Sequence, residues 1–143
     1  MNRKESGISF GRILKILLII MGVLIICTAV FFWFYIHKNA KLALRDAKNV
    51  YMALNSVEIE YYAQGKSIYD PKKYNGLADG VLKKVQDLVE NEGTFRILSY
   101  DEKSHQILVL QYRLGYYQIN YYYSPTETVW EVNYMFNVYR FED

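Results

Sequence analysis

Few residues in this sequence could do chemistry, and the closest group of them lies between positions 101 and 105. Asp101, Glu102 and His105 are residue types that bind metal ions. They stand, however, in a short polar segment between two β-rich runs, where such residues usually form a solvated turn. We therefore interpret the group as a hairpin tip and expect neither a metal site nor a cofactor.

Acid–base and nucleophilic catalysis have no better candidates. Glu58 and Glu60 are two positions apart, so on a helix they point in different directions and cannot act on one group. The serines and the two histidines lack the context of a nucleophile elbow, and there is no glycine-rich phosphate loop. We predict that the protein is not an enzyme and has no catalytic residue.

Tyrosine is abundant, with 15 among the 143 residues, and five of the tyrosines gather at Tyr116, Tyr117, Tyr121, Tyr122 and Tyr123. Such a group could present a surface to carbohydrate or peptide. Aromatic residues are also favoured in strands and in cross-strand pairs. We favour the second interpretation, in which these side chains stabilise a sheet.

Composition narrows the class of protein. The chain is 52% hydrophobic, which is too much for a disordered chain, and its length allows one modest domain. A net charge of +2 gives no indication of nucleic-acid binding. The single cysteine, Cys27, excludes a disulfide within this chain. Function is therefore expected to follow from anchoring and assembly.

The strongest signal is an apolar segment near the N-terminus. Residues 16–36 carry no formal charge, and a helix of this length matches the ~30 Å hydrocarbon core of a bilayer. The aromatic run 31–35, followed by Lys38, is typical of a membrane interface. The residues after Ala29 stay strongly apolar, which favours an uncleaved signal anchor over a cleaved signal peptide. We predict a transmembrane helix in the lipid bilayer.

This span divides the chain into a short basic segment over 1–15, the transmembrane helix over 16–36 and a domain over 37–143. Cations flank the span equally on both sides, so the positive-inside rule alone does not set its orientation. A short basic head is readily retained, whereas long domains cross largely regardless of charge. We expect a single-pass protein of the cell membrane with a cytoplasmic N-terminus and an extracellular C-terminal domain.

The helix is predicted to continue beyond the membrane, over about 14–63. Apolar side chains spaced three and four apart mark one face of it, namely Leu44, Ala47, Tyr51, Leu54, Val57 and Tyr61. Gly65 is a suitable stop. The second half of this helix is therefore amphipathic and needs a surface to pack against.

A second helix and then a sheet are predicted for the rest of the chain. Loop residues over 65–78 precede an apolar stripe that predicts a helix over 79–91, ended by Gly93. Four β-rich runs follow from Thr94, with turns at 101–104, 115 and 124–127, and they predict an antiparallel meander.

The last run, 128–141, shows the expected two faces of the sheet. One face carries Trp130, Val132, Tyr134, Phe136 and Val138, and the other carries Glu131, Asn133 and Asn137. The apolar face is what the amphipathic half of the long helix can cover. The predicted fold class is α+β, with a long N-terminal helix packed on a C-terminal four-stranded antiparallel sheet and one additional short helix.

The end of the long helix carries a local pattern, in which residues 45–50 lead to Glu60-Tyr61-Tyr62, Gly65, Tyr69 and Pro71. This pattern is similar to the tyrosine-rich helix end, glycine turn and Tyr-Pro-like step of type IV pilins, and the architecture as a whole resembles these proteins and the pseudopilins of type II secretion. The resemblance implies a membrane-anchored structural subunit that packs through its long helix against other pilin-like or membrane subunits. The alternative is a stand-alone bitopic protein whose exported domain binds a ligand or regulates a membrane partner.

The N-terminus departs from the family pattern. Gly7, after a short basic leader, stands where a prepilin is processed, but the fifth residue after it is Arg12. The family has a glutamate there, which neutralises the N-terminal amine of a neighbouring subunit. A cation at that position repels the amine. We therefore expect that most of the protein keeps its N-terminus.

Overall fold

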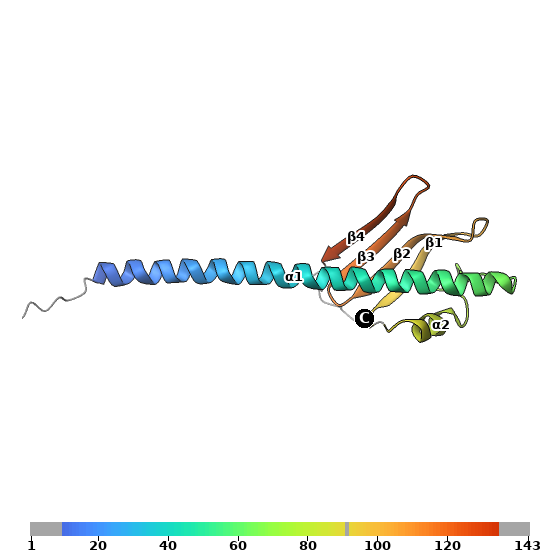
Figure 1. Cartoon of the computed structure of the whole chain (residues 1–143), viewed down its shortest axis with the longest axis horizontal. Helices are drawn as coiled ribbons and strands as arrows, with labels where there is room; N and C mark the ends of the chain where they lie inside the picture. Colours follow the sequence, from blue (N-terminus) through green and yellow to red (C-terminus); the bar gives the residue numbers. More distant parts are fainter. Residues whose placement is uncertain (1–9, 91, 135–143) are drawn as a thin grey trace, which may run out of the picture. The chain divides into compact units, whose positions relative to one another are not determined.

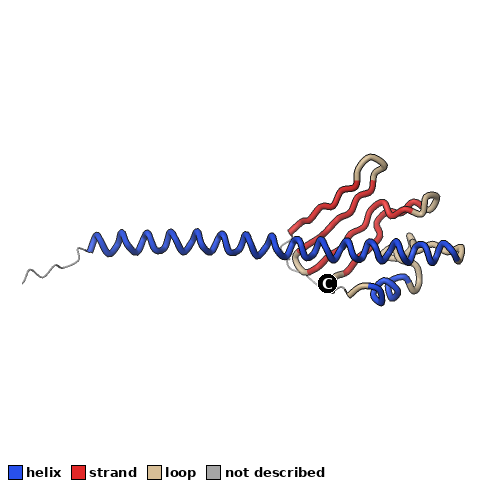
Figure 2. Tube along the Cα trace, viewed as in Figure 1, coloured by secondary structure: helices blue, strands red, loops and turns tan. Residues whose placement is uncertain are grey.

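The computed structural model describes residues 10–90 and 92–134. Two helices precede four strands in these residues (Figures 1 and 2). Their bounds are α1 Phe10–Ala63, α2 Val81–Leu88, β1 Thr94–Asp101, β2 Gln106–Leu114, β3 Tyr117–Tyr123 and β4 Thr128–Tyr134. All four strands form one antiparallel sheet in the order β1-β2-β3-β4. The predicted α+β class and the predicted meander are confirmed.

The chain divides into two compact units, Met1–Lys38 and Asn39–Asp143. The described part of the first unit is the N-terminal part of α1, which is long and apolar enough to cross a membrane and has none of its apolar stretch buried. The described helix already includes Phe10, which precedes the predicted start near residue 14. Arg12 and Lys15 do not interrupt it, because both are good helix formers.

In the second unit, α1 buries one stripe against the inner face of the sheet, and Figure 1 shows this part of the helix crossing the strands. The buried side chains are Ala43, Ala47, Val50, Ala53, Leu54, Val57, Glu58 and Tyr61. The predicted stripe is confirmed at four of its positions, while Leu44 and Tyr51 are only half-buried. The observed stripe is wider than the predicted one because a helix that covers a sheet buries more than a single row.

The end of α1 has the form that the glycine predicts. Gly65 adopts a φ of 68°, in the left-handed region. Its N–H donates to the Tyr62 carbonyl at 2.9 Å, and the Lys66 N–H donates to the Tyr61 carbonyl at 2.9 Å. These two bonds form a Schellman motif, which satisfies carbonyls that the helix end would leave free.

The second helix is shorter than predicted, so the expected bounds 79–91 were wrong at both ends. Gly80 has a φ of 83° and cannot belong to the helix, and Val89 is already extended. The apolar stripe that predicted this helix does not stay buried to its C-terminal end, since Leu88 is 58% exposed. Val81 and Val85 are the two side chains that α2 buries.

Register irregularities in β1 change which side chains face α1. They lie between Ile97 and Ser99 and between Ser99 and Tyr100. Phe95 and Ile97 are buried, but the alternation of inner and outer side chains does not continue through Ser99. Instead, the bulge turns Tyr100 toward the helix, where its hydroxyl meets a side chain of α1.

The two-faced character of β4 is confirmed where the strand is described. Trp130 and Val132 are half-buried, and Glu131 and Asn133 are exposed. Tyr134, the last residue of β4, is exposed, although it was assigned to the apolar face. The predicted continuation through Phe136, Asn137 and Val138 lies outside the described residues. Tyr116, predicted as the start of the third strand, precedes β3 instead.

Candidate functional site on the long helix

The apolar part of α1 presents its surface on all sides. Its large apolar side chains from Phe10 to Tyr35 are at least 49% exposed. Within this stretch, the Thr28 hydroxyl donates to the Leu24 carbonyl of its own helix at 2.7 Å. A hydroxyl satisfied in this way needs no partner in hydrocarbon. This part of α1 is long and apolar enough to cross a membrane.

Aromatic rings mark the end of this surface. Trp33 stacks on His37 with ring centroids 5.4 Å apart, and it meets Phe34 edge-on at 5.4 Å. Tyr35 is exposed beside them. Rings that combine an apolar body with a polar edge are favoured at the boundary between hydrocarbon and water.

A buried polar cluster lies between α1 and the β1–β2 hairpin. Glu58 is 6% exposed, and its Oε1 accepts a hydrogen bond from the Tyr100 hydroxyl at 2.6 Å. The His105 Nδ1 lies 3.0 Å from the same oxygen. Burial, followed by the hydrogen bond to Glu58, raises the pKa of Tyr100 well above its ordinary value. The cluster ties the helix to the hairpin.

Aromatic rings pack against this cluster, in which the His105 side chain stays 34% exposed. Tyr62 of α1 contacts the His105 ring edge-on at 4.6 Å, and Tyr69 stacks on Tyr100 at 5.4 Å. His105 has a positive φ of 52°, in the left-handed region that histidine adopts more readily than most residues do. The hairpin places the imidazole facing α1, within hydrogen-bond distance of Glu58.

Asp101, Glu102 and His105, which were considered as metal ligands, have separate structural roles. The Asp101 carboxylate accepts from the Ser104 hydroxyl at 2.6 Å and from the Lys103 N–H at 3.0 Å, so it closes the turn. The Ser104 hydrogen bond is the main cause that lowers the pKa of Asp101. Glu102 is exposed, and His105 is engaged with Glu58. In the described ranges, no three metal-binding side chains come together.

The two glutamates of α1 are separated, as their spacing predicts. Glu58 faces the sheet, whereas Glu60 is exposed and pairs with Lys84 of α2. Glu58 was missed as a member of a site, although one signal was present. An acid directly after Val57 and four residues beyond Leu54 interrupts the apolar stripe, and a buried acid requires a partner.

The tyrosine group does not form one surface. Tyr117 and Tyr121 are buried on the inner face, while Tyr116, Tyr122 and Tyr123 are exposed. The Tyr121 hydroxyl lies 2.8 Å from that of Tyr51 on α1, and its ring centroid is 4.8 Å from Trp130. Tyr121 thus joins α1 to the sheet, which agrees with the interpretation that these tyrosines stabilise a sheet.

The fold and the site together define the chain as an α+β protein. Among the described helices, only α1 is long and apolar enough to span a membrane. The second part of α1 packs on the four-stranded sheet. No family model, curated protein or solved structure matches the chain.

Proposed function

We propose that this chain is a membrane-anchored, pilin-like structural subunit, of the minor or divergent type IV pilin or pseudopilin kind. It assembles with other pilin-like or membrane subunits through α1. The observation that carries this proposal is the division of one continuous helix. Phe10–Ala63 exposes apolar side chains in its first part and buries a stripe against an antiparallel sheet in its second part.

The energy of exposed apolar surface supports an anchoring role. A large apolar side chain left in water forgoes ~1.5–3 kcal/mol of burial free energy. Ile19, Ile25 and Phe31 are each more than 60% exposed, and they represent a surface that continues round the helix. So much exposed apolar area is stable in lipid or in a helix bundle.

The charge at the start of α1 supports a retained basic head on the cytoplasmic side, with the α+β domain outside the cell. Arg12 and Lys15 lie one turn apart, and the first turn contains no acidic residue. Cations at this depth are favourable beside anionic lipid. Gly7 lies outside the described residues, and intact-mass spectrometry of the purified protein tests its processing. A dominant species that begins at Ile8 would contradict a retained head.

Cysteine cross-linking in native membranes tests assembly. The lone Cys27 is first replaced by alanine, and single cysteines are then placed at each position from 22 to 29. If α1 packs against a defined neighbour, cross-linked products recur about every three to four residues, because one helical face makes the contact.

Two controls make the outcome decisive. The Cys27→Ala parent reports background, and the same scan after dilution in detergent reports collision between solubilised chains. Products that are absent in membranes, or that are equally strong at every position, would refute a packed assembly through this part of α1.

A further inference from the structure

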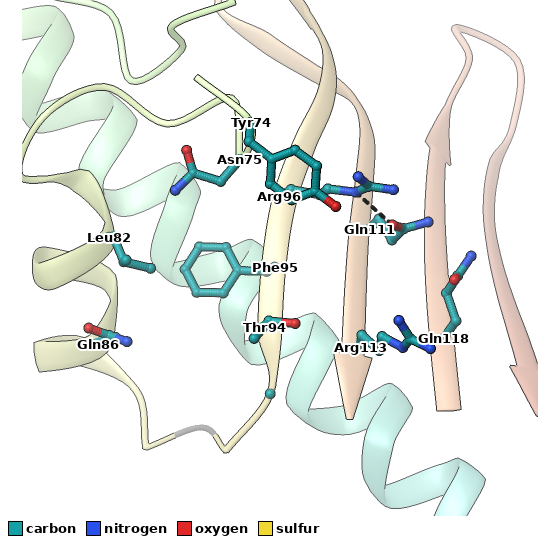
Figure 3. A pocket seen from close by; sticks show the side chains of 11 residues that line it. Tyr74, Asn75, Leu82, Gln86, Thr94, Phe95, Arg96, Gln111, Arg113 and Gln118 are labelled. Atoms are coloured by element: carbon teal, nitrogen blue, oxygen red, sulfur yellow. Dashed lines mark hydrogen bonds between the residues drawn. The ribbon is translucent and has the colours of Figure 1, made fainter. Parts of the chain in front are cut away.

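A groove lies over the outer face of the sheet, beside α2, and has a volume of about 410 Å³. Figure 3 shows Arg96, Gln111, Arg113 and Gln118 on the strands, with Leu82 and Gln86 of α2 across from them. The strand residues alternate with the buried inner side chains, so the groove is on the opposite face from α1.

Side chains on the floor of this groove are held by one another. Asn120 is 8% exposed, and its Oδ1 accepts hydrogen bonds from Gln111 Nε2 at 3.2 Å and from Gln118 Nε2 at 3.3 Å. Gln111 Oε1 in turn accepts from Arg96 Nε at 2.7 Å. These hydrogen bonds orient the Arg96 guanidinium on the side that faces the sheet.

Above the same guanidinium lies the ring of Tyr74, whose centroid is 5.3 Å from Arg96 Cζ. Tyr74 is 89% exposed, so this contact lies at the surface and not in the core. With Nε bonded to Gln111 and one face against Tyr74, the two amino groups at the end of Arg96 remain available. An arginine held in this way is ordered before any ligand arrives.

Positive charge in the groove is not neutralised locally. Arg96 and Arg113 are its charged lining residues, and no carboxylate among the described residues lies within ion-pair distance of either. The register makes Arg96 and Arg113 diagonal neighbours on adjacent strands, with side chains ~7–8 Å apart at their bases. With their bases at this spacing, two arginine side chains are long enough to converge on one anion placed between them.

We propose that this groove binds a small carboxylate-bearing ligand. The carboxylate bridges Arg96 and Arg113, and the apolar or planar remainder of the ligand lies against Tyr74 and Leu82. A flat carboxylate matches the fork of an arginine, and the groove supplies a second arginine and amide donors around it. The lining includes no glycine-rich loop at a helix N-terminus, which is the usual cradle of a phosphate group.

NMR titration of the full chain in detergent micelles tests this proposal. The probe is benzoate, and benzamide serves as its neutral control of the same shape. We expect benzoate to shift the side-chain signals of Arg96, Gln111 and Gln118 in a saturable manner, while benzamide leaves them in place. N-acetylphenylalanine and glucuronate then distinguish a peptide terminus from an acidic sugar as the source of the carboxylate.

Matched variants locate the site. Arg96→Gln and Arg113→Gln should each weaken benzoate binding about tenfold or more, because each removes one charged partner. Lys103→Gln removes a positive charge in the β1–β2 turn and should leave binding unchanged. An unchanged backbone spectrum in each variant shows that the fold is intact.

Three results would overturn the proposal. Benzamide could bind as well as benzoate, the two arginine variants could bind as tightly as the parent, or inorganic phosphate could saturate the groove while carboxylates do not. The site is on the sheet and the proposed assembly surface is on the apolar helix, so the proposed function does not depend on this result.

Discussion

The substitution Leu54→Asp tests whether the second part of α1 is packed on the sheet. Leu54 is fully buried in the middle of the helix stripe. Losing its burial costs ~1.5–3 kcal/mol, and an unpaired carboxylate in an apolar site adds several more. A domain of ordinary stability has only ~5–15 kcal/mol in total. The variant is therefore expected to lose its folded α+β domain.

Met52→Asp is the matched control for this experiment. Met52 is two positions away on the same helix and is 58% exposed. Both variants introduce the same residue type into a helix interior, so the intrinsic helix cost of aspartate is nearly equal in the two. The difference between them therefore measures burial against the sheet.

Limited proteolysis in native membranes provides the assay. The parent and Met52→Asp should give a protected fragment that contains the sheet, and Leu54→Asp should lose it while the chain stays in the membrane fraction. Equal protease resistance of the two aspartate variants would refute the packing of this part of α1 on the sheet.

Three further predictions concern single features of the domain. Glu58→Ala should lower the free energy of unfolding by about 1–3 kcal/mol, because it removes the acceptor shared by the half-buried Tyr100 and His105. Glu60→Ala at an exposed site should change it by less than about 0.5 kcal/mol. Urea unfolding of both variants checks this. Gly76→Ala should be much more destabilising than Gly115→Ala in the same assay. Both glycines have positive φ, but only at Gly76 would a Cβ lie 2.2 Å from a backbone carbonyl oxygen, that of Ile97. Burial raises the pKa of Tyr112 to about 12, so the domain should lose stability as the pH rises from about 10 to 12, and Tyr112→Phe should reduce that loss when urea midpoints are compared across this range.

Periodicity predicts burial, and this is why the architecture could be read from the sequence. The stripe on α1 and the alternation along the strands both follow from one face meeting the core. Gly65 was predictive because its left-handed conformation is needed at that helix end. The ends of α2 were not predictable in this way, because an apolar stripe continued past the point where Val89 leaves the helix.

The cluster around Glu58 could not be predicted from periodicity, because it depends on the irregular register of β1. Strict alternation from Phe95 places Tyr100 on the outer face, and only the irregular register of β1 turns it toward Glu58. His105 reaches the same carboxylate from a left-handed backbone conformation at the end of the β1–β2 turn. The irregular register is a property of the paired strands, which the sequence of one strand does not reveal.

The groove could not be predicted from the sequence, because it depends on the register between neighbouring strands. Arg96, Gln111 and Asn120 are far apart in sequence, and each alone is an ordinary polar residue on the outer face. Cross-strand pairing sets them in one row, since Arg96 is opposite Gln111 and Gln111 is opposite Asn120. Alternation within one strand identifies a face, but it does not identify the neighbours across it.

The most direct test of the central claim is thiol labelling on intact cells. That claim is a membrane-spanning helix that carries the α+β domain to the cell exterior. In a Cys27→Ala background, Lys103→Cys places one thiol at the exposed β1–β2 turn. A membrane-impermeant maleimide should label this variant on intact cells. It should not label the parent chain that keeps Cys27, because that cysteine is expected to lie in lipid. Labelling of the Lys103→Cys variant only after lysis, or labelling of the parent on intact cells, would contradict the account.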